Sequence, residues 1–252
     1  MNETGKQTLL KPILEKIFNF RCHKAIPCFT KCCAGLNLIL TPYDIVRLKN
    51  RLGISSDQFL DRYSETKFDK HPRFPMMTLR MNPDQRQSCP FLTPAGCDIY
   101  DDRPGACRIY PLGRAALKVD EEKGAREKYF IVQEEHCLGF GEQREWSVHE
   151  WLIDEGVDKY NTMNDHWLEI ISSPQSLGKK EEIARKIQMF SMASYNLDKF
   201  RTFIFNSRFL DLFEVADNLK VRMASDDEAL MLFSFDWLKF SLFGEQTIQL
   251  KS

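Results

Sequence analysis

The sequence contains no long apolar segment and no excess of one charge. Its apolar runs, such as residues 36–40, are far shorter than the roughly 18 to 20 residues that a membrane-spanning helix needs. Lysine and arginine number 35 and aspartate and glutamate 36, which gives a net charge of -1. No overall field therefore favours nucleic acid or an anionic membrane. We predict a protein with neither a membrane span nor nucleic acid as a partner.

The first 20 residues lack the features of a secretion signal. Glu3, Lys11, Glu15 and Lys16 interrupt what would be its apolar core, and no small-residue cleavage site follows. We therefore expect a cytoplasmic protein. In a reducing compartment a cysteine-rich module is more often a metal site than a disulfide framework. A chain of 252 residues that is 43% hydrophobic can also bury a core without covalent crosslinks.

Several common catalytic motifs are missing. The sequence has no GxGxxG, Walker loop, GxSxG or HExxH, so nucleotide, hydrolase and zinc-peptidase chemistries lack support. A CxxxCxxC radical-SAM loop is also absent, because Cys33 follows Cys32 directly. No general acid, base or nucleophile stands out. The sequence leaves open whether this protein is an enzyme, and its catalytic residues are unknown.

Cysteine and proline are unevenly distributed. No cysteine follows Cys137, and Pro174 is the only proline after Pro111. The first part should be loop-rich around a site, and the second part has helical patterning with many aromatic residues. We predict an α+β, mainly helical fold, with an irregular cysteine-cluster metal-binding domain at 1–145 and a helical region at 146–252 packed on it. The helical aromatics favour core packing, with a protein partner or substrate surface as the alternative.

Local patterns predict individual elements. Thr41-Pro42-Tyr43-Asp44 has the cap, proline and acidic residue of a helix start, and Gly53 marks its end. A second helix should begin at Ser55 or Ser56. Strands are expected at 77–81, 116–119 and 129–133, the last two as a hairpin across 120–128, and further helices at 147–157, 161–171, 178–192, 196–216 and 225–243.

All eight cysteines are candidate metal ligands. Thiolate sulfur is a soft, charged ligand suited to iron-sulfur clusters, zinc or copper(I). The side chains of adjacent residues diverge, so Cys32 and Cys33 suit a polynuclear cluster or two neighbouring sites better than one small ion. Zinc and a cubane cluster each take four thiolates, so eight cysteines could serve two centres, or some could be structural thiols. The candidates are Cys22, Cys28, Cys32, Cys33, Cys89, Cys97, Cys107 and Cys137.

Residues beside the cysteines are candidates for supporting roles. Arg103 and Arg108 flank Cys107, where guanidinium groups would offset thiolate charge or bind an anionic cofactor or substrate. Salt bridges to nearby aspartates, at 98, 101 and 102, are the alternative. His23 and His136 each adjoin a cysteine and could complete a metal site. Tyrosines 100 and 110 are expected to pack over the site and exclude water.

The order of these motifs resembles a known family. A CC pair is followed by Cys89-Pro90-Phe91-Leu92, Gly96-Cys97-Asp98-Ile99-Tyr100, the segment 103–111 (RPGACRIYP) and 137–141 (CLGFG). Over residues 20 to 143 the chain resembles the YkgJ-type CxxCxxCC family, described as zinc- or iron-chelating. This chain departs from the compact family motif, with five residues between Cys22 and Cys28 and three between Cys28 and Cys32. Flagellin lysine methylases contain a similar module.

Three functions follow from this pattern. The first is a metal-binding protein with an iron-sulfur centre, or less favourably zinc, in redox, metal-handling or protein-modification work. The second is a structural zinc module whose helical half binds another protein. The third, implied only by the resemblance, is a cluster-containing protein lysine methyltransferase. Metal ions are the partners predicted in all three cases.

Overall fold

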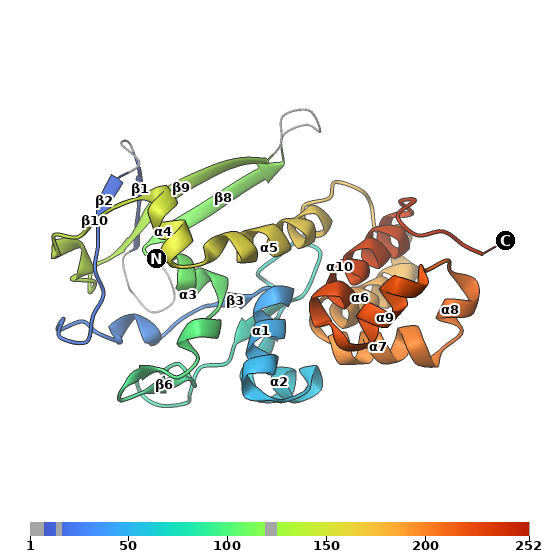
Figure 1. Ribbon diagram of the computed structural model, residues 1–252, viewed down its shortest axis with the longest axis horizontal. Coiled ribbons are helices and arrows are strands. Elements are labelled where there is room, and N and C mark those ends of the chain that lie inside the picture. Colours follow the sequence, from blue (N-terminus) through green and yellow to red (C-terminus); the bar gives the residue numbers. More distant parts are fainter. Residues whose placement is uncertain (1–7, 14–16, 119–124, 252) are drawn as a thin grey trace. The chain divides into compact units, whose positions relative to one another are not determined.

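The computed structural model describes residues 8–13, 17–118 and 125–251 (Figure 1). The chain forms two compact units, and each contains two stretches of sequence. Met1–Leu38 with Met81–Tyr160 form the first, called here the cysteine unit, and Ile39–Arg80 with Asn161–Ser252 form the second, the helical unit. The predicted α+β, mainly helical class is confirmed. The chain passes from one unit to the other after residues 38, 80 and 160. The domain boundary predicted near residue 145 stays a prediction.

A three-stranded antiparallel sheet is the largest regular element of the cysteine unit (Figure 1). Strand β9 (Ala125–Glu134) lies between β1 (Thr8–Pro12) and β8 (Leu112–Lys118). Leu112 pairs with Ile131, and Gly113 lies opposite Phe130. The predicted hairpin is confirmed with longer strands, and residues 119–124 lie outside the described part.

The other elements of the cysteine unit are short, as expected for a loop-rich module. Strand β2 pairs with β10, and β6 with β7. Helix α5 (Val157–Ile171) begins in this unit and continues into the helical unit. The short elements are β2 (Ile17–Asn19), β6 (Leu92–Thr93), β7 (Gly96–Cys97), β10 (Glu145–Ser147), α3 (Gly105–Ile109), α4 (Val148–Asp154) and 3-10 turns at Lys31–Cys33, Tyr100–Asp102 and Gly139–Gly141.

An aromatic core supports the cysteine unit. Phe20 makes edge-to-face contacts with Trp151, Phe140 and Tyr110, at ring-centroid distances of 5.6, 5.3 and 5.9 Å. The indole Nε1–H of Trp146 donates to the carbonyl of Phe20 at 2.9 Å. Aromatic pairs in this geometry add roughly 0.5–1.5 kcal/mol each beyond area burial. This core fixes the backbone that leads into Cys22.

The helical unit begins with two capped helices. Thr41 and Asp44 form the reciprocal capping box of α1 (Pro42–Leu52), which ends at Gly53 in the left-handed conformation. Ser55 and Gln58 cap α2 (Ser56–Tyr63) in the same way. Both helices match the sequence prediction, because the cap residues satisfy otherwise free N–H groups. A small sheet accompanies them, in the order β3 (Ile39–Leu40), β5 (Met76–Leu79) and β4 (Ser64–Lys67).

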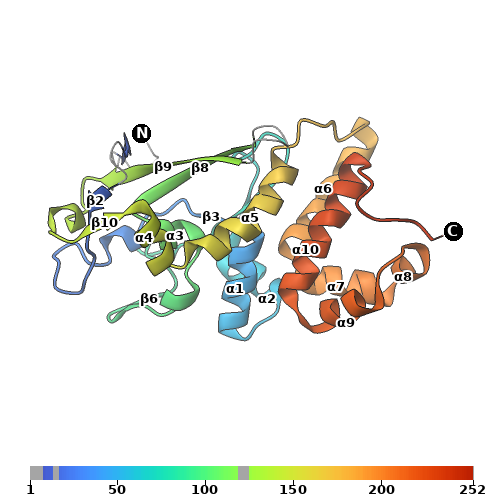
Figure 2. The same ribbon diagram turned by 45° about the horizontal axis from the view of Figure 1, so that its top comes forward.

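Five helices and a π-helical turn complete the described part of the helical unit. Helices α6 and α10 lie side by side (Figure 2). The predicted single helix at 196–216 is wrong: Ser207 is extended and separates α7 from α8, and α9 follows. The elements are α6 (Lys180–Tyr195), α7 (Leu197–Asn206), α8 (Phe209–Leu212), α9 (Asp217–Ser225), α10 (Asp227–Leu238) and a π-helical turn at Lys239–Phe243.

A buried ionic network joins three helices of this unit. Lys49 of α1, with a 7% exposed side chain, lies 2.8 Å from an Asp227 oxygen and 3.6 Å from Asp198. Arg201 lies 2.5 Å from Asp227 and 3.0 Å from Asp198. Burial raises the pKa of Asp227, but hydrogen bonds from Lys49 and Arg201 outweigh it and hold the pKa below its usual value. In the described part of the chain, no helix has both the length and the apolarity needed to cross a membrane.

Candidate metal centre

All eight cysteines lie in the cysteine unit as free thiols. Four lie on the irregular segment after β2, and Cys137 follows β9. Cys89 precedes β6, Cys97 ends β7, and Cys107 lies in α3. Short loops and caps therefore bring ligand candidates together from both sequence stretches of one unit.

The first thiol group consists of Cys22, Cys28, Cys32 and Cys137. Partial burial and the nearby charges of the other three thiolates together raise the pKa of Cys22 to about 11. Burial also raises the pKa of Cys137, with contributions from Cys28 and Cys32. The charges of these thiolates therefore act on one another across a site in which Cys28 is buried, Cys32 and Cys137 are half-buried and Cys22 is exposed. The group includes Cys137, the cysteine most distant in sequence.

The second thiol group consists of Cys33, Cys89 and Cys97, and the charge of Cys107 acts on Arg103, which also lies near Cys97. The Cys89 N–H donates to the Cys33 carbonyl at 2.8 Å, and the charge of Cys97 contributes to the raised pKa of Cys89 after burial. The ring of Phe29 lies against Gly96, so it brings the first cysteine segment beside β7. A side-chain hydrogen bond between Cys32 and Cys33 connects the two groups and raises the pKa of Cys32.

Backbone N–H groups point at several of the sulfur atoms. The Leu138 N–H donates to the Cys28 sulfur at 3.2 Å. Each of Cys89, Cys97 and Cys137 also accepts a hydrogen bond from the backbone of the second residue after it, and these bonds lower the thiol pKa against the larger effect of burial. Such N–H donors stabilise the thiolate, which is the form that binds metal.

The thiols are gathered but not arranged as a coordination sphere. Among residues 8–13, 17–118 and 125–251, no three cysteine, histidine or carboxylate side chains are placed to hold one ion. Burial favours neutral thiols, and a metal cation would supply the positive charge that the thiolates need. The donor set fits a metal chemically, and ligation would require the loops to draw the sulfur atoms together.

Tyr110 forms one wall of the first thiol group. Burial raises its pKa well above the usual value, and the nearby charges of Cys137, Glu134 and Cys32 add to the rise. Its ring packs on Phe20, as expected for a residue that excludes water. Tyr100 is different: it is 57% exposed, with the Arg103 guanidinium 3.8 Å from its ring centroid. Its predicted packing over the site is wrong.

Arg103 and Arg108 converge on Glu155 at the end of α4. The Arg103 guanidinium pairs with the Glu155 carboxylate and donates to the Tyr100 carbonyl at 3.0 Å. Arg108 donates to the carbonyls of Glu155 and Asp101, both at 2.6 Å. Arg103 still lies close enough to Cys97 and Cys22 for its charge to lower their pKa values against burial. It therefore offsets thiolate charge while Glu155 holds it.

The two histidines beside cysteines each face a glutamate. His23 Nε2 lies 3.5 Å from Glu142, and His136 Nε2 lies 3.4 Å from Glu134. Glu134 is also near enough to Cys32 for its charge to raise that thiol's pKa, after the larger effects of Cys33 and burial. Metal ligation by His23 or His136 stays a prediction.

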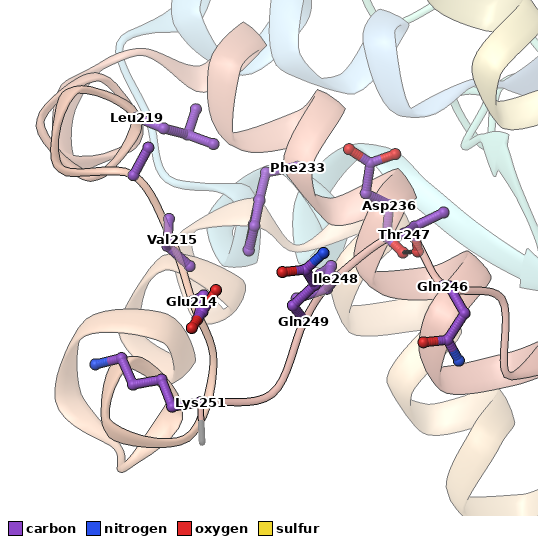
Figure 3. A pocket seen from close by; sticks show the side chains of 11 residues that line it. Glu214, Val215, Leu219, Phe233, Asp236, Gln246, Thr247, Ile248, Gln249 and Lys251 are labelled. Atoms are coloured by element: carbon purple, nitrogen blue, oxygen red, sulfur yellow. Dashed lines mark hydrogen bonds between the residues drawn. The ribbon is translucent and has the colours of Figure 1, made fainter.

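One cavity lies in the helical unit (Figure 3). It measures about 620 Å³ and opens between α9, α10 and the chain after residue 245. Phe233 and Ile248 line it together with the charged residues Glu214, Asp236 and Lys251 (Figure 3). No cysteine or histidine is among the described residues that line it. It is therefore separate from the thiol chemistry.

Comparison with known proteins supports metal binding. Residues 21–141 match the model of the CxxCxxCC family, described as a "putative zinc- or iron-chelating domain". The resemblance inferred from the motifs is thus confirmed, and the matched segment contains all eight cysteines. No curated protein and no solved structure matches the chain.

The sequence did not reveal the acidic partners of this site. Glu155 lies 52 positions after Arg103, and its proximity follows from how α4 packs, which no local pattern encodes. Glu134 is one of two acidic residues in β9. The sequence contains one weak indication that Glu134 lies near the thiols, because this residue comes three positions before Cys137.

Proposed function

We propose that the domain at residues 21–141 holds an iron-sulfur centre through cysteine thiolates. The first ligand set consists of Cys22, Cys28, Cys32 and Cys137. The second set, Cys33, Cys89, Cys97 and Cys107, serves either a second centre or the periphery of the first. An iron-sulfur cluster supplies one-electron transfer when bound.

The observation that carries this proposal is the set of N–H groups directed at sulfur. Leu138 donates to Cys28, and the residues after Cys89, Cys97 and Cys137 act in the same way. A buried structural thiol needs no such donors, whereas a thiolate ligand is stabilised by them. Hydrogen bonds to sulfur also raise the reduction potential of a cluster.

Two further features favour iron-sulfur over mononuclear zinc. Cys32 and Cys33 are adjacent and connect both thiol groups, so more sulfur atoms gather than one tetrahedral ion can use. The wall of Tyr110 and Phe20 keeps water away, which limits hydrolytic loss of a cluster and tunes its potential. Arg103, held by Glu155, supplies a fixed positive charge beside the thiolates.

Anaerobic purification with quantification of iron, labile sulfide and zinc tests the proposal. We expect absorbance near 400 nm and iron and sulfide in comparable amounts. Cys28→Ser should remove the centre of the first ligand set and so lower this absorbance by half or more, whereas Ala25→Ser, an exposed serine substitution in the same loop, should leave the absorbance unchanged. A colourless, zinc-loaded protein would refute the iron-sulfur centre and leave the structural zinc module. A protein that binds neither metal would refute both.

The number of centres can be read from variants of the second group. If two centres exist, Cys97→Ser should remove about half of the iron and leave the remainder with unchanged absorbance. If one centre exists, Cys97→Ser should leave iron content near that of the wild type.

In the same preparations, calorimetry with a methyl donor tests the lysine methyltransferase hypothesis, since an enzyme of that type must bind the donor.

A further inference from the structure

A second cavity, of about 550 Å³, lies beside the first thiol group. Three segments of the cysteine unit line it: Phe29 to Lys31 with Ala34, then Arg86, then Glu135 with His136. Lys31 precedes Cys32, and His136 precedes Cys137. The cavity is thus built from residues directly adjacent to two of the proposed ligands.

The lining carries more positive than negative charge. Lys31 and Arg86 are both exposed, and the Arg86 charge lies near enough to Asp84 to lower the pKa of that carboxyl. Glu135 is the one acidic residue in the lining. Arg103 and Arg108, in contrast, are already occupied by Glu155. Lys31 and Arg86, which Glu155 does not hold, therefore supply the positive charge of the cavity lining.

The backbone around the cavity is held in an uncommon conformation. Thr30 and Gln87 are the two non-glycine residues of the described chain with positive φ, at 66° and 48°. Thr30 lines the cavity, and Gln87 follows Arg86. The Gly35 N–H donates to the Gln87 carbonyl at 2.9 Å, and Ala34 forms a bridge with Ser88. Strained residues of this kind persist where the surrounding structure fixes them, and they cluster at ligand sites.

We propose that this cavity binds a small oxyanion, carrying phosphate or carboxylate groups, between Lys31 and Arg86. The assignment rests on the proposed function, because it places the anion beside the thiolate-bound centre. Guanidinium and ammonium groups recognise both oxyanions through charge-assisted hydrogen bonds. The Phe29 ring provides an apolar surface for a carbon skeleton attached to the anion.

The test is calorimetry on the full-length, metal-loaded protein under anaerobic conditions at low ionic strength. Inorganic phosphate and citrate serve as separate probes, which distinguishes a phosphate site from a carboxylate site. We expect saturable binding of at least one probe. Lys31→Gln and Arg86→Gln should each weaken it by about tenfold, the effect of removing one charge-assisted contact. Lys24→Gln, an exposed cation outside the lining, should leave it unchanged.

Two outcomes would overturn the inference. One is the absence of binding for both probes, and the other is equal affinity in the wild type and the Lys31→Gln/Arg86→Gln double variant. Iron, sulfide and zinc are quantified in the same samples. Loaded protein without anion binding would refute this site alone. Metal-free protein with Lys31- and Arg86-dependent phosphate binding would refute the metal centre and retain the anion site.

Discussion

The buried ionic network of the helical unit allows a quantitative prediction for Lys49→Met. Methionine keeps much of the side-chain length and removes the charge that lies 2.8 Å from Asp227. Asp227 has a 12% exposed side chain, so water cannot replace the lost partner. The substitution should therefore destabilise the protein well beyond the effect of a lost surface charge.

The expected loss of stability depends on the ion pairs that remain in the variant. Removing one partner of a buried ion pair costs about 3–5 kcal/mol. Arg201 still contacts Asp227 and Asp198 in the variant, so part of the charge stays compensated. We expect the free energy of unfolding to fall by about 2–3 kcal/mol, between the full buried penalty and a neutral result. The control is Lys199→Met, which removes an exposed ion pair with Asp57. For this variant we expect the free energy of unfolding to fall by about 0–1 kcal/mol.

Urea denaturation followed by helical circular dichroism measures both variants, and pH provides a second reading. The pKa of folded Asp227 is lowered, so its stabilising contribution is present above its unfolded pKa, near 4, and is lost as pH falls through the folded value. In Lys49→Met, burial should instead favour the protonated carboxyl. The difference in the free energy of unfolding between the wild type and Lys49→Met should therefore become smaller below about pH 4. A loss no larger than that of Lys199→Met, or a difference independent of pH, would refute the reasoning.

Three further predictions concern single contacts, each measured by urea or thermal denaturation. Thr41→Ala removes the cap of α1 and should cost about 1 kcal/mol, whereas Thr41→Ser should keep most of it; equal losses would argue against the cap. Gly113→Ala should destabilise the β8–β9 hairpin by about 1–3 kcal/mol because the new Cβ would overlap the Phe130 ring, while Gly141→Ala, with open space around it, should be tolerated. Glu155→Gln should cost about 1–3 kcal/mol through loss of the Arg103 ion pair, and an unchanged midpoint would contradict a stabilising role.

The elements that the sequence predicted well are those with local chemical signals. Helix α1 begins at the capping box of Thr41 and Asp44 and ends at Gly53. These residues provide hydrogen bonds for the free backbone groups at the two helix ends, and they do so independently of tertiary contacts. The single helix predicted at 196–216 failed for the opposite reason. Its apolar periodicity is continuous through Phe203 and Phe209, but packing of Phe209 on Trp237, 5.0 Å between centroids, requires a turn at Ser207. The periodicity of apolar residues contains no signal for such a turn.

The candidate site was predictable in composition and not in arrangement. Soft ligands and their motifs identified all eight cysteines as candidates, and the family match supports metal binding by the segment that contains them. The pairing of Arg103 with Glu155 depends on the packing of α4 and has no local signature. The meeting of Lys31 and Arg86 in one cavity lining likewise becomes evident only once their loops are placed together.

The hydrogen bond from Leu138 to the Cys28 sulfur joins two parts of the chain 110 residues apart. A metal held by Cys28 and Cys137 would make this contact a crosslink that encloses β6, α3, β8 and β9 in one loop. Closing a loop of about 100 residues reduces the entropy of the unfolded chain by the equivalent of about 4.7 kcal/mol in the chain-entropy model. The helical segment Ile39–Arg80 lies within the same loop in sequence, so metal loading would restrict the unfolded chain of both units. Loss of the metal would then loosen the connection between two sequence-distant segments, in the manner of a reduced disulfide.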